Sequence, residues 1–261
     1  MATLKMIAAF LKVNLQIALA YRADTTVNIL INLMWLGWEL LGLSIIFSNT
    51  TSLAGWGPGE LITLLGVFRL VNMLMAAVIW PATEKFNTSV RDGSLDYVLL
   101  MPANSLFLVS FARIVVWRVW DLALAVTLIA VGVHYGGETV TWLNLFYFLL
   151  LAVAGALVMY SLWVVLVALT FWFVKFDNNV TIIQALMDSG RYPVSIYPSW
   201  LRLIVTYIVP IAIATTVPVQ GLYGDLSGSQ VALFMGIGLA AFLIATRVWK
   251  AGVQHYSGAS S

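Results

Sequence analysis

Long apolar runs that carry almost no charge constrain this chain more than any other feature. The run from Trp142 to Val174 contains no Asp, Glu, Lys or Arg, and a membrane-spanning helix needs about 20 apolar residues. Hydrophobic residues make up 62% of the 261 residues and charged residues only 9%, whereas an ordinary globular domain carries about 25% charged residues. The composition therefore excludes a water-soluble fold and suffices for about six spanning helices with their connections.

The few polar side chains also exclude several classes of function. With 13 Lys and Arg against 11 Asp and Glu, the net charge is only +2, so we expect no nucleic-acid partner. The absence of Cys excludes disulfides, thiol catalysis and cysteine metal sites. An intramembrane enzyme needs a nucleophile and a base at a common depth, and no Ser and Lys share an apolar run. We expect no catalytic residue, metal or cofactor in this chain.

The pattern of apolar runs and turn residues predicts an all-α, polytopic membrane protein that forms a single transmembrane domain. An amphipathic helix over residues 2–22 is expected to lie in the membrane interface, although the same residues also fit a frayed start of the first span. Six spans are predicted at 25–47, 61–81, 106–133, 142–174, about 178–196 and 231–249.

The positions of Lys and Arg determine the predicted orientation, because these residues concentrate in cytoplasmic loops. With a cytoplasmic N-terminus and six crossings, eight basic residues lie inside and only Arg191 and Arg202 lie outside. Two full crossings between residues 178 and 219 would move Arg247 and Lys250 outside. We therefore expect one crossing there and both termini in the cytoplasm, with residues 198–224 forming re-entrant or external helices.

The polar stretch 82–104 is the most informative part of the chain. It alternates apolar and charged residues, Gly93 allows a bend, and Pro102 ends helical pairing before the next span begins. From the residues alone, two interpretations fit. The stretch is either a docking element for a partner or a solvated loop held by its own apolar side chains.

Within this stretch, Arg91-Asp-Gly-Ser-Leu-Asp-Tyr-Val-Leu-Leu-Met-Pro102 resembles the coupling helix of ABC-2 type transporter permeases, which lies between their second and third spans. Phe171-Trp-Phe173, Tyr192-Pro-Val-Ser-Ile-Tyr-Pro-Ser-Trp-Leu-Arg202 and Arg247-Val-Trp-Lys250 are similar to other parts of that family, in particular a six-span subgroup of about 260 residues. The resemblance implies an exporter subunit in the bacterial cytoplasmic membrane, paired with a second permease as a homodimer or a heterodimer.

The resemblance also implies separate ABC ATPase subunits that dock on the coupling region. The residues that it assigns to this docking are Glu84, Arg91, Gly93, Leu95, Asp96, Val98 and Pro102. Among these, Glu84 and Asp96 are expected to meet basic residues of the ATPase, and Leu95 and Val98 its apolar cleft. The chain has no G-x-x-x-x-G-K-[ST] motif, so ATP and Mg²⁺ are expected in the partner.

Ionisable residues inside the predicted spans are candidates for the transport pathway, because a charge in hydrocarbon needs a partner or a wet cavity. In one interpretation they lock the bundle, Glu39 pairing with Arg69, or Asp121 with Arg118. In the other, some of them line a cavity that contacts a polar or anionic substrate. The complete set is Glu39, Arg69, Arg113, Arg118, Asp121, Asp188 and Arg191.

Two alternatives to a transporter driven by ATP remain at this point. A structural or assembly membrane protein fits the composition equally well. A secondary transporter that works without ATP is the other, although its usual sign, an inverted repeat, is not evident. The substrate is not identified by the sequence.

Overall fold

A computed structural model describes residues 22–115, 118–137, 139–173, 179–208 and 210–256. Within these ranges the chain is helical, apart from turns and one isolated bridge between Leu53 and Trp56. Nearly all of the predicted interface helix, residues 2–21, lies outside the described residues.

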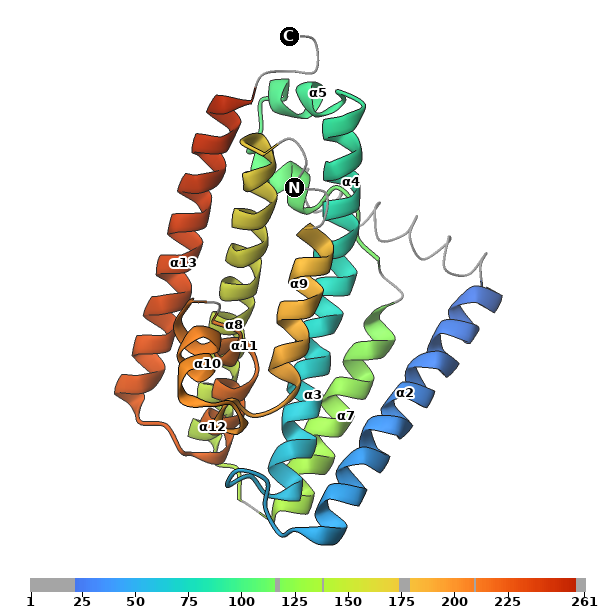
Figure 1. Cartoon of the computed structure of the whole chain (residues 1–261), viewed down its shortest axis with the longest axis vertical. Coiled ribbons are helices and arrows are strands. Elements are labelled where there is room, and N and C mark those ends of the chain that lie inside the picture. Colours follow the sequence, from blue (N-terminus) through green and yellow to red (C-terminus); the bar gives the residue numbers. More distant parts are fainter. Residues whose placement is uncertain (1–21, 116–117, 138, 174–178, 209, 257–261) are drawn as a thin grey trace.

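Four helices are long and apolar enough to cross a membrane. One of them is continuous over residues 58–91 and consists of α3 (Pro58–Leu74), a π-helical turn (Met75–Ile79) and α4 (Trp80–Arg91). The other three are α2 (Arg22–Asn49), α8 (Trp142–Ala168) and α13 (Gly228–His255). These helices run along the long axis of the molecule, with the shorter α7 (Val119–Gly136) and α9 (Asn179–Asp188) among them (Figure 1).

The 58–91 helix continues well past Pro81, where the sequence predicts the second span to end. Proline lacks an N–H and interrupts the regular hydrogen-bond ladder of an α-helix. Here the π-helical turn Met75–Ile79 comes directly before α4 and changes the hydrogen-bond register. The helix therefore absorbs Pro81 without ending and carries the predicted coupling region as its own extension.

The predicted third span, 106–133, is not one helix. The chain forms α6 (Ser105–Ser110), leaves helical geometry over residues 111–115, and resumes in α7. In the non-helical part, Val115 N–H donates to the carbonyl of Ala77 at 2.8 Å, within the π-helical turn. The π-helical turn of the 58–91 helix thus supplies a hydrogen-bond acceptor to the non-helical segment 111–115.

Short helices fill the region from residue 189 to residue 223. They are α10 (Ser199–Leu203), α11 (Ile211–Ala214) and α12 (Thr216–Tyr223), with 3₁₀ turns at Ser189–Arg191 and Val194–Ile196. All four residues of α11 are buried, and the short helices pack at the end of the bundle where α13 begins (Figure 1). Pro193, Pro198, Pro210 and Pro218 explain why no long helix forms here.

Glycines set the closest helix contact, which joins α3 to α7. A Cβ on Gly66 would lie 2.7 Å from Ile129 Cγ1, and a Cβ on Gly132 would lie 2.3 Å from Thr63 Oγ1. Small residues at such positions let two helix backbones approach, which is how helices gain packing energy in lipid. Helix α2 lies beside this closely packed pair (Figure 1).

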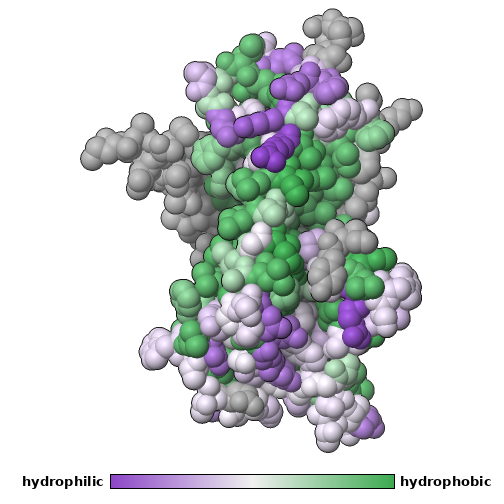
Figure 2. Space-filling model, turned by 90° about the vertical axis from the view of Figure 1, so that its left-hand side faces the viewer, coloured by the Kyte–Doolittle hydropathy of each residue, from purple (hydrophilic) through white to green (hydrophobic). Residues whose placement is uncertain are grey.

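The surface carries an apolar band between two more polar ends, as expected of a membrane protein (Figure 2). On α13, for example, Leu233, Leu239 and Leu243 are each more than half exposed. The end that carries α5 (Leu95–Leu100) also receives the last turn of α13 (Figure 1). The apolar helices and the exposed apolar band together identify an integral membrane protein.

Candidate functional site

Helix α2 is only loosely attached to the bundle. None of its residues in the most apolar stretch is buried, and Met34 and Trp38 are 64% and 72% exposed. An apolar helix that makes so few contacts leaves a gap beside it, and that gap lies between α2 and α3. Polar side chains from both helices meet in it.

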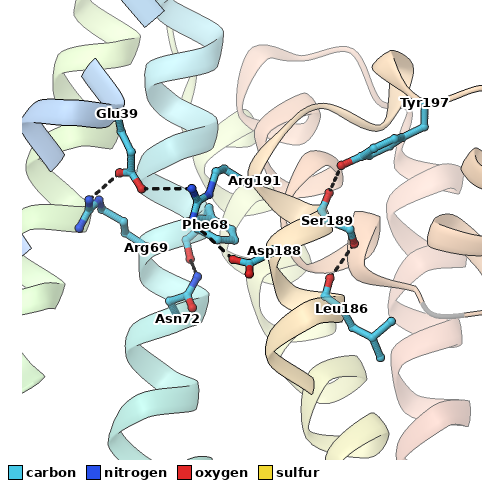
Figure 3. Close-up of polar contacts among 9 residues, drawn as sticks. All are labelled: Glu39, Phe68, Arg69, Asn72, Leu186, Asp188, Ser189, Arg191 and Tyr197. Atoms are coloured by element: carbon cyan, nitrogen blue, oxygen red, sulfur yellow. Dashed lines mark hydrogen bonds and ion pairs between the residues drawn. The ribbon is translucent and has the colours of Figure 1, made fainter. Parts of the chain in front are cut away.

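Glu39 is the centre of these polar contacts (Figure 3). Arg69 Nη2 donates to Glu39 Oε2 at 2.5 Å, and the two side chains are only 14% and 17% exposed. The second carboxylate oxygen, Oε1, lies 4.0 Å from Nη1 of Arg191. The pairing of Glu39 with Arg69, one of the two interpretations of the sequence, is confirmed.

Arg191 connects this pair to the segment after α9. Its Nη2 lies 3.4 Å from Asp188 Oδ1, and its guanidinium carbon lies 5.5 Å from the centre of the Phe68 ring (Figure 3). A cation over an aromatic ring within about 6 Å is attracted by the ring electrons. Arg191 therefore has three attractive neighbours but no short contact, and its side chain is 41% exposed.

A second ion pair lies at the start of α7. Arg118 Nη1 donates to Asp121 Oδ2 at 3.1 Å, so this predicted pair is confirmed as well. Asp121 stands in the first turn of α7, where the partial positive charge of the helix N-terminus also stabilises a carboxylate. The two sequence interpretations are thus compatible, because the paired residues also line a cavity.

That cavity, which we call the inner cavity, has a volume of about 380 Å³. Among the described residues of its wall, Arg69 and Trp80 each have a buried donor, Nε and Nε1, without a hydrogen-bond acceptor. A buried donor without an acceptor costs about 1–3 kcal/mol, so the wall is better suited to a molecule that brings acceptor oxygens. The full lining is Asn32, Trp35, Glu39, Phe68, Arg69, Asn72, Met73, Ala76, Trp80, Arg118, Asp121, Asp188 and Arg191.

Six of the seven predicted intramembrane charges line the inner cavity, and Arg113 does not. Arg113 lies 3.8 Å from Glu84, and both side chains are more than 60% exposed. The reason is the break between α6 and α7, which places Arg113 in the non-helical part near the coupling region. Its contact with Glu84 is a surface ion pair, a type that contributes at most about 1 kcal/mol.

The sequence interpretation did not identify the uncharged lining residues, and of these Asn32, Trp35, Asn72 and Trp80 carry polar side-chain atoms. Helical spacing could have found three of them. Asn32 and Trp35 precede Glu39 by seven and four positions, and Asn72 follows Arg69 by three, so each shares a face with the charge. Trp80 resembled an interfacial anchor because the span seemed to end at Pro81.

The predicted coupling residues form a tight turn followed by the short helix α5. Asp92 Oδ1 accepts from the Ser94 amide at 2.9 Å and from its hydroxyl at 2.6 Å, and these hydrogen bonds lower the pKa of the Asp92 carboxyl. Gly93 has a φ of +73°, which side chains with a Cβ rarely adopt. Pro102 follows Met101, where the backbone is extended after α5 ends.

The apolar side chains of α5 point in two directions. Leu95 is fully buried, and Val98 is partly buried against the same core. Tyr97 and Leu100 are instead 73% and 81% exposed, and Met101 is 51% exposed. Leu95 and Val98 thus attach α5 to the bundle, while the other three form an exposed apolar surface, the α5 tip.

A family model described as "ABC-2 family transporter protein" matches residues 33–260. The match includes α2 from Leu33 onward, the inner cavity except Asn32, and the α5 tip. No curated protein and no solved structure matches the chain.

Proposed function

The chain belongs to the ABC-2 family of transporter proteins, and on that premise we propose that it is the permease subunit of an exporter in the bacterial cytoplasmic membrane. ATP is bound with Mg²⁺ and hydrolysed by separate ABC ATPase subunits. The exported substrate is unidentified. The permease itself supplies the path and carries out no chemistry.

The observation that carries this proposal is the α5 tip. Tyr97, Leu100 and Met101 expose large apolar side chains at a polar end of the molecule, where water makes such exposure unfavourable. Apolar side chains exposed next to polar residues are typical of protein interaction sites. Arg91, the last residue of α4, and Asp96, in the first turn of α5, flank the bend at Gly93 and offer charges to the ATPase.

The roles of the coupling residues follow from their positions. Leu95 and Val98 hold α5 against the bundle, and Gly93 and Pro102 set the bends before and after it. Glu84 lies about two helical turns before Arg91 on α4, where it pairs loosely with Arg113. We therefore assign the apolar contact with the ATPase to Tyr97 and Leu100 instead of Leu95 and Val98.

Movement at the tip has two routes into the bundle. Phe86 on α4 packs against Phe171, in the 3₁₀ turn Leu169–Phe171 that follows α8, and against Trp249 of α13, with ring centres 5.7 and 5.8 Å away. Phe86 therefore connects α4 to the end of the α8 helix and to α13. The second route is the 58–91 helix itself, because Arg69 and Trp80 of the inner cavity stand on the same continuous helix as Phe86. A tilt of that helix would change the shape of the cavity.

A second permease is the partner that best fits α2. This helix exposes Leu30, Met34, Leu41 and Ile45 by 58–65%. A helix with so little contact to its own bundle gains packing energy when it meets another helix in the membrane. The second permease is either another copy of this chain or a related one.

Affinity purification of the full chain from its native membranes tests the proposal. We expect an ATP-binding subunit to co-purify with vanadate-sensitive ATPase activity. Replacing both Tyr97 and Leu100 with Glu is expected to remove that subunit while the permease stays in the membrane. Leu100→Met is the control, because it keeps the α5 tip apolar, and it is expected to retain the subunit.

The two alternatives have distinct outcomes in the same preparation. A stable complex that never hydrolyses ATP would favour a structural or assembly protein. Substrate movement by the isolated permease, without any ATPase, would favour a secondary transporter.

A further inference from the structure

A second cavity lies next to the inner cavity along the gap between α2 and α3. Its volume is about 230 Å³. Its wall includes Gly42 and Ile46, which follow Glu39 on α2, whereas Asn32 of the inner cavity precedes Glu39. Because α2 ends at the end of the molecule opposite α5 (Figure 1), residues that follow Glu39 lie toward that end, and we call the second cavity the outer cavity.

Glu39 and Arg191 belong to the walls of both cavities. The two side chains therefore stand at the boundary between them. Arg69, on the 58–91 helix, holds Glu39 through an ion pair of 2.5 Å between Nη2 and Oε2. Arg191 is held less firmly, because it stands on a 3₁₀ turn and lies 4.0 Å from Glu39.

The charges of the inner cavity are balanced. Its wall carries three arginines and three carboxylates, so an anion that enters must exchange with a resident carboxylate. The distance between Glu39 and Arg191, 4.0 Å, is the longest among the ion pairs of this wall, since the others measure 2.5, 3.1 and 3.4 Å. This pair is the one that an incoming anion separates at the lowest cost.

We propose, building on the proposed transport function, that the contact between Glu39 and Arg191 is a gate between the inner and outer cavities. An oxyanion group of the transported molecule, a carboxylate or a phosphate, opens the gate by drawing Arg191 away from Glu39. The buried donors Arg69 Nε and Trp80 Nε1, which have no acceptor, receive the oxygens of that group. Hydrogen bonds from a guanidinium to an oxyanion are among the strongest in proteins.

Cysteine labelling tests the gate directly, because the chain contains no Cys. Gly42→Cys reports on the outer cavity, where a Cβ on Gly42 meets nothing within 4 Å, and Asn72→Cys reports on the inner cavity. The full chain is placed in oriented vesicles, and a membrane-impermeant maleimide is added on the face opposite α5. We expect Gly42→Cys to react and Asn72→Cys to react slowly.

Opening the gate by mutation should expose the inner cavity to the reagent. Arg191→Ala is expected to raise the labelling rate of Asn72→Cys about fivefold, which is the factor that corresponds to the strongest exposed ion pairs. Arg191→Lys keeps the charge and should raise the labelling rate less. Glu39→Gln provides an independent variant that keeps the size of the side chain. Equal labelling of Asn72→Cys with and without these changes would overturn the gate, as would an unreactive Gly42→Cys.

The ligand class is tested in the same vesicles without any mutation at the gate. One set contains phosphatidic acid in phosphatidylcholine, and the other contains phosphatidylcholine alone with inorganic phosphate added to the solution. Faster labelling of Asn72→Cys with phosphatidic acid assigns the oxyanion to a lipid, and with inorganic phosphate to a soluble molecule. If neither phosphatidic acid nor inorganic phosphate accelerates the labelling, the proposal that an oxyanion opens the gate is wrong. Because no ATPase is present, failure here is distinct from failure of the ATPase to co-purify.

Discussion

Arg69 on the 58–91 helix donates to Glu39 on α2 at 2.5 Å, and both side chains are largely buried in the gap between the two helices. The apolar side chains of α2 point mostly away from the bundle. This single ion pair is therefore a principal attachment of α2 to the rest of the molecule.

Removing one partner of this pair should destabilise the protein. Arg69→Ala leaves the Glu39 carboxylate without its closest cation, and breaking a buried pair in this way costs about 3–5 kcal/mol. We expect the lower end of that range, because the cavity leaves both side chains slightly exposed. Thermal unfolding in detergent micelles measures the loss. The double variant Glu39→Leu/Arg69→Leu should recover much of it, and a double variant as unstable as the single one would contradict this.

The contact between α3 and α7 makes a second prediction, with a matched control. Gly66→Ala places a Cβ 2.7 Å from Ile129, and overpacking of this kind costs about 1–3 kcal/mol. Gly42→Ala on α2 meets nothing within 4 Å, and Ala is the better helix former by about 1 kcal/mol. Unfolding temperatures should fall for the first and hold or rise for the second. Equal effects of the two substitutions would show that the close contact is absent.

The turn before α5 depends on Gly93. Its φ of +73° costs a residue with a Cβ about 1–2 kcal/mol, so Gly93→Ala should move α5 and weaken ATPase binding while leaving helix content unchanged. Gly93→Asn is the matched control, because Asn tolerates this conformation better than Ala. Co-purified ATPase, measured per permease, should decrease in the order Gly, Asn, Ala, and a different order would disagree with this role.

The same turn should respond to acid. Hydrogen bonds from the Ser94 hydroxyl and amide hold the pKa of Asp92 below its usual value of 3.8. A carboxyl with a lowered pKa in the folded state contributes stability above pH 3.8 that is lost as the pH falls through the lowered value. Hydrogen exchange at the Ser94 amide should therefore be slow at pH 5 and accelerate, after correction for intrinsic rates, only in stronger acid. In Asp92→Asn this acid-dependent step should disappear.

Much of the fold follows from simple patterns in the sequence. The sequence runs that form α2, α8 and α13 are long, apolar and bounded by turn residues, so these helices can be predicted without knowledge of tertiary contacts. The stretch predicted as the third span contains two helices, α6 and α7, because hydropathy does not report hydrogen bonds between backbone groups that are distant in sequence. Ile114 and Val115 look like helix interior, but the Val115 amide pairs with Ala77 instead.

The candidate site was predictable in part, for a similar reason. The cost of charge in lipid identified Glu39, Arg69 and Arg191 individually, and the first two as a pair. Their meeting with Trp80 required the 58–91 helix to pass through Pro81, which a π-helical turn permits and a sequence pattern does not reveal. Likewise, the apolar residues of α5 were evident, whereas their division into buried Leu95 and exposed Leu100 depends on how α5 lies on the bundle.

In the proposed transporter, ATP hydrolysis by the partner ATPase acts through the α5 tip and changes the width of the gap beside α2. Spin labels at Leu41→Cys on α2 and Leu239→Cys on α13, two exposed positions, measure this by electron–electron double resonance in the complex with its ATPase. ATP with vanadate should shift the distance distribution, and replacing Tyr97 and Leu100 with Glu should abolish the shift. A distribution that ATP leaves unchanged in the intact complex would contradict it.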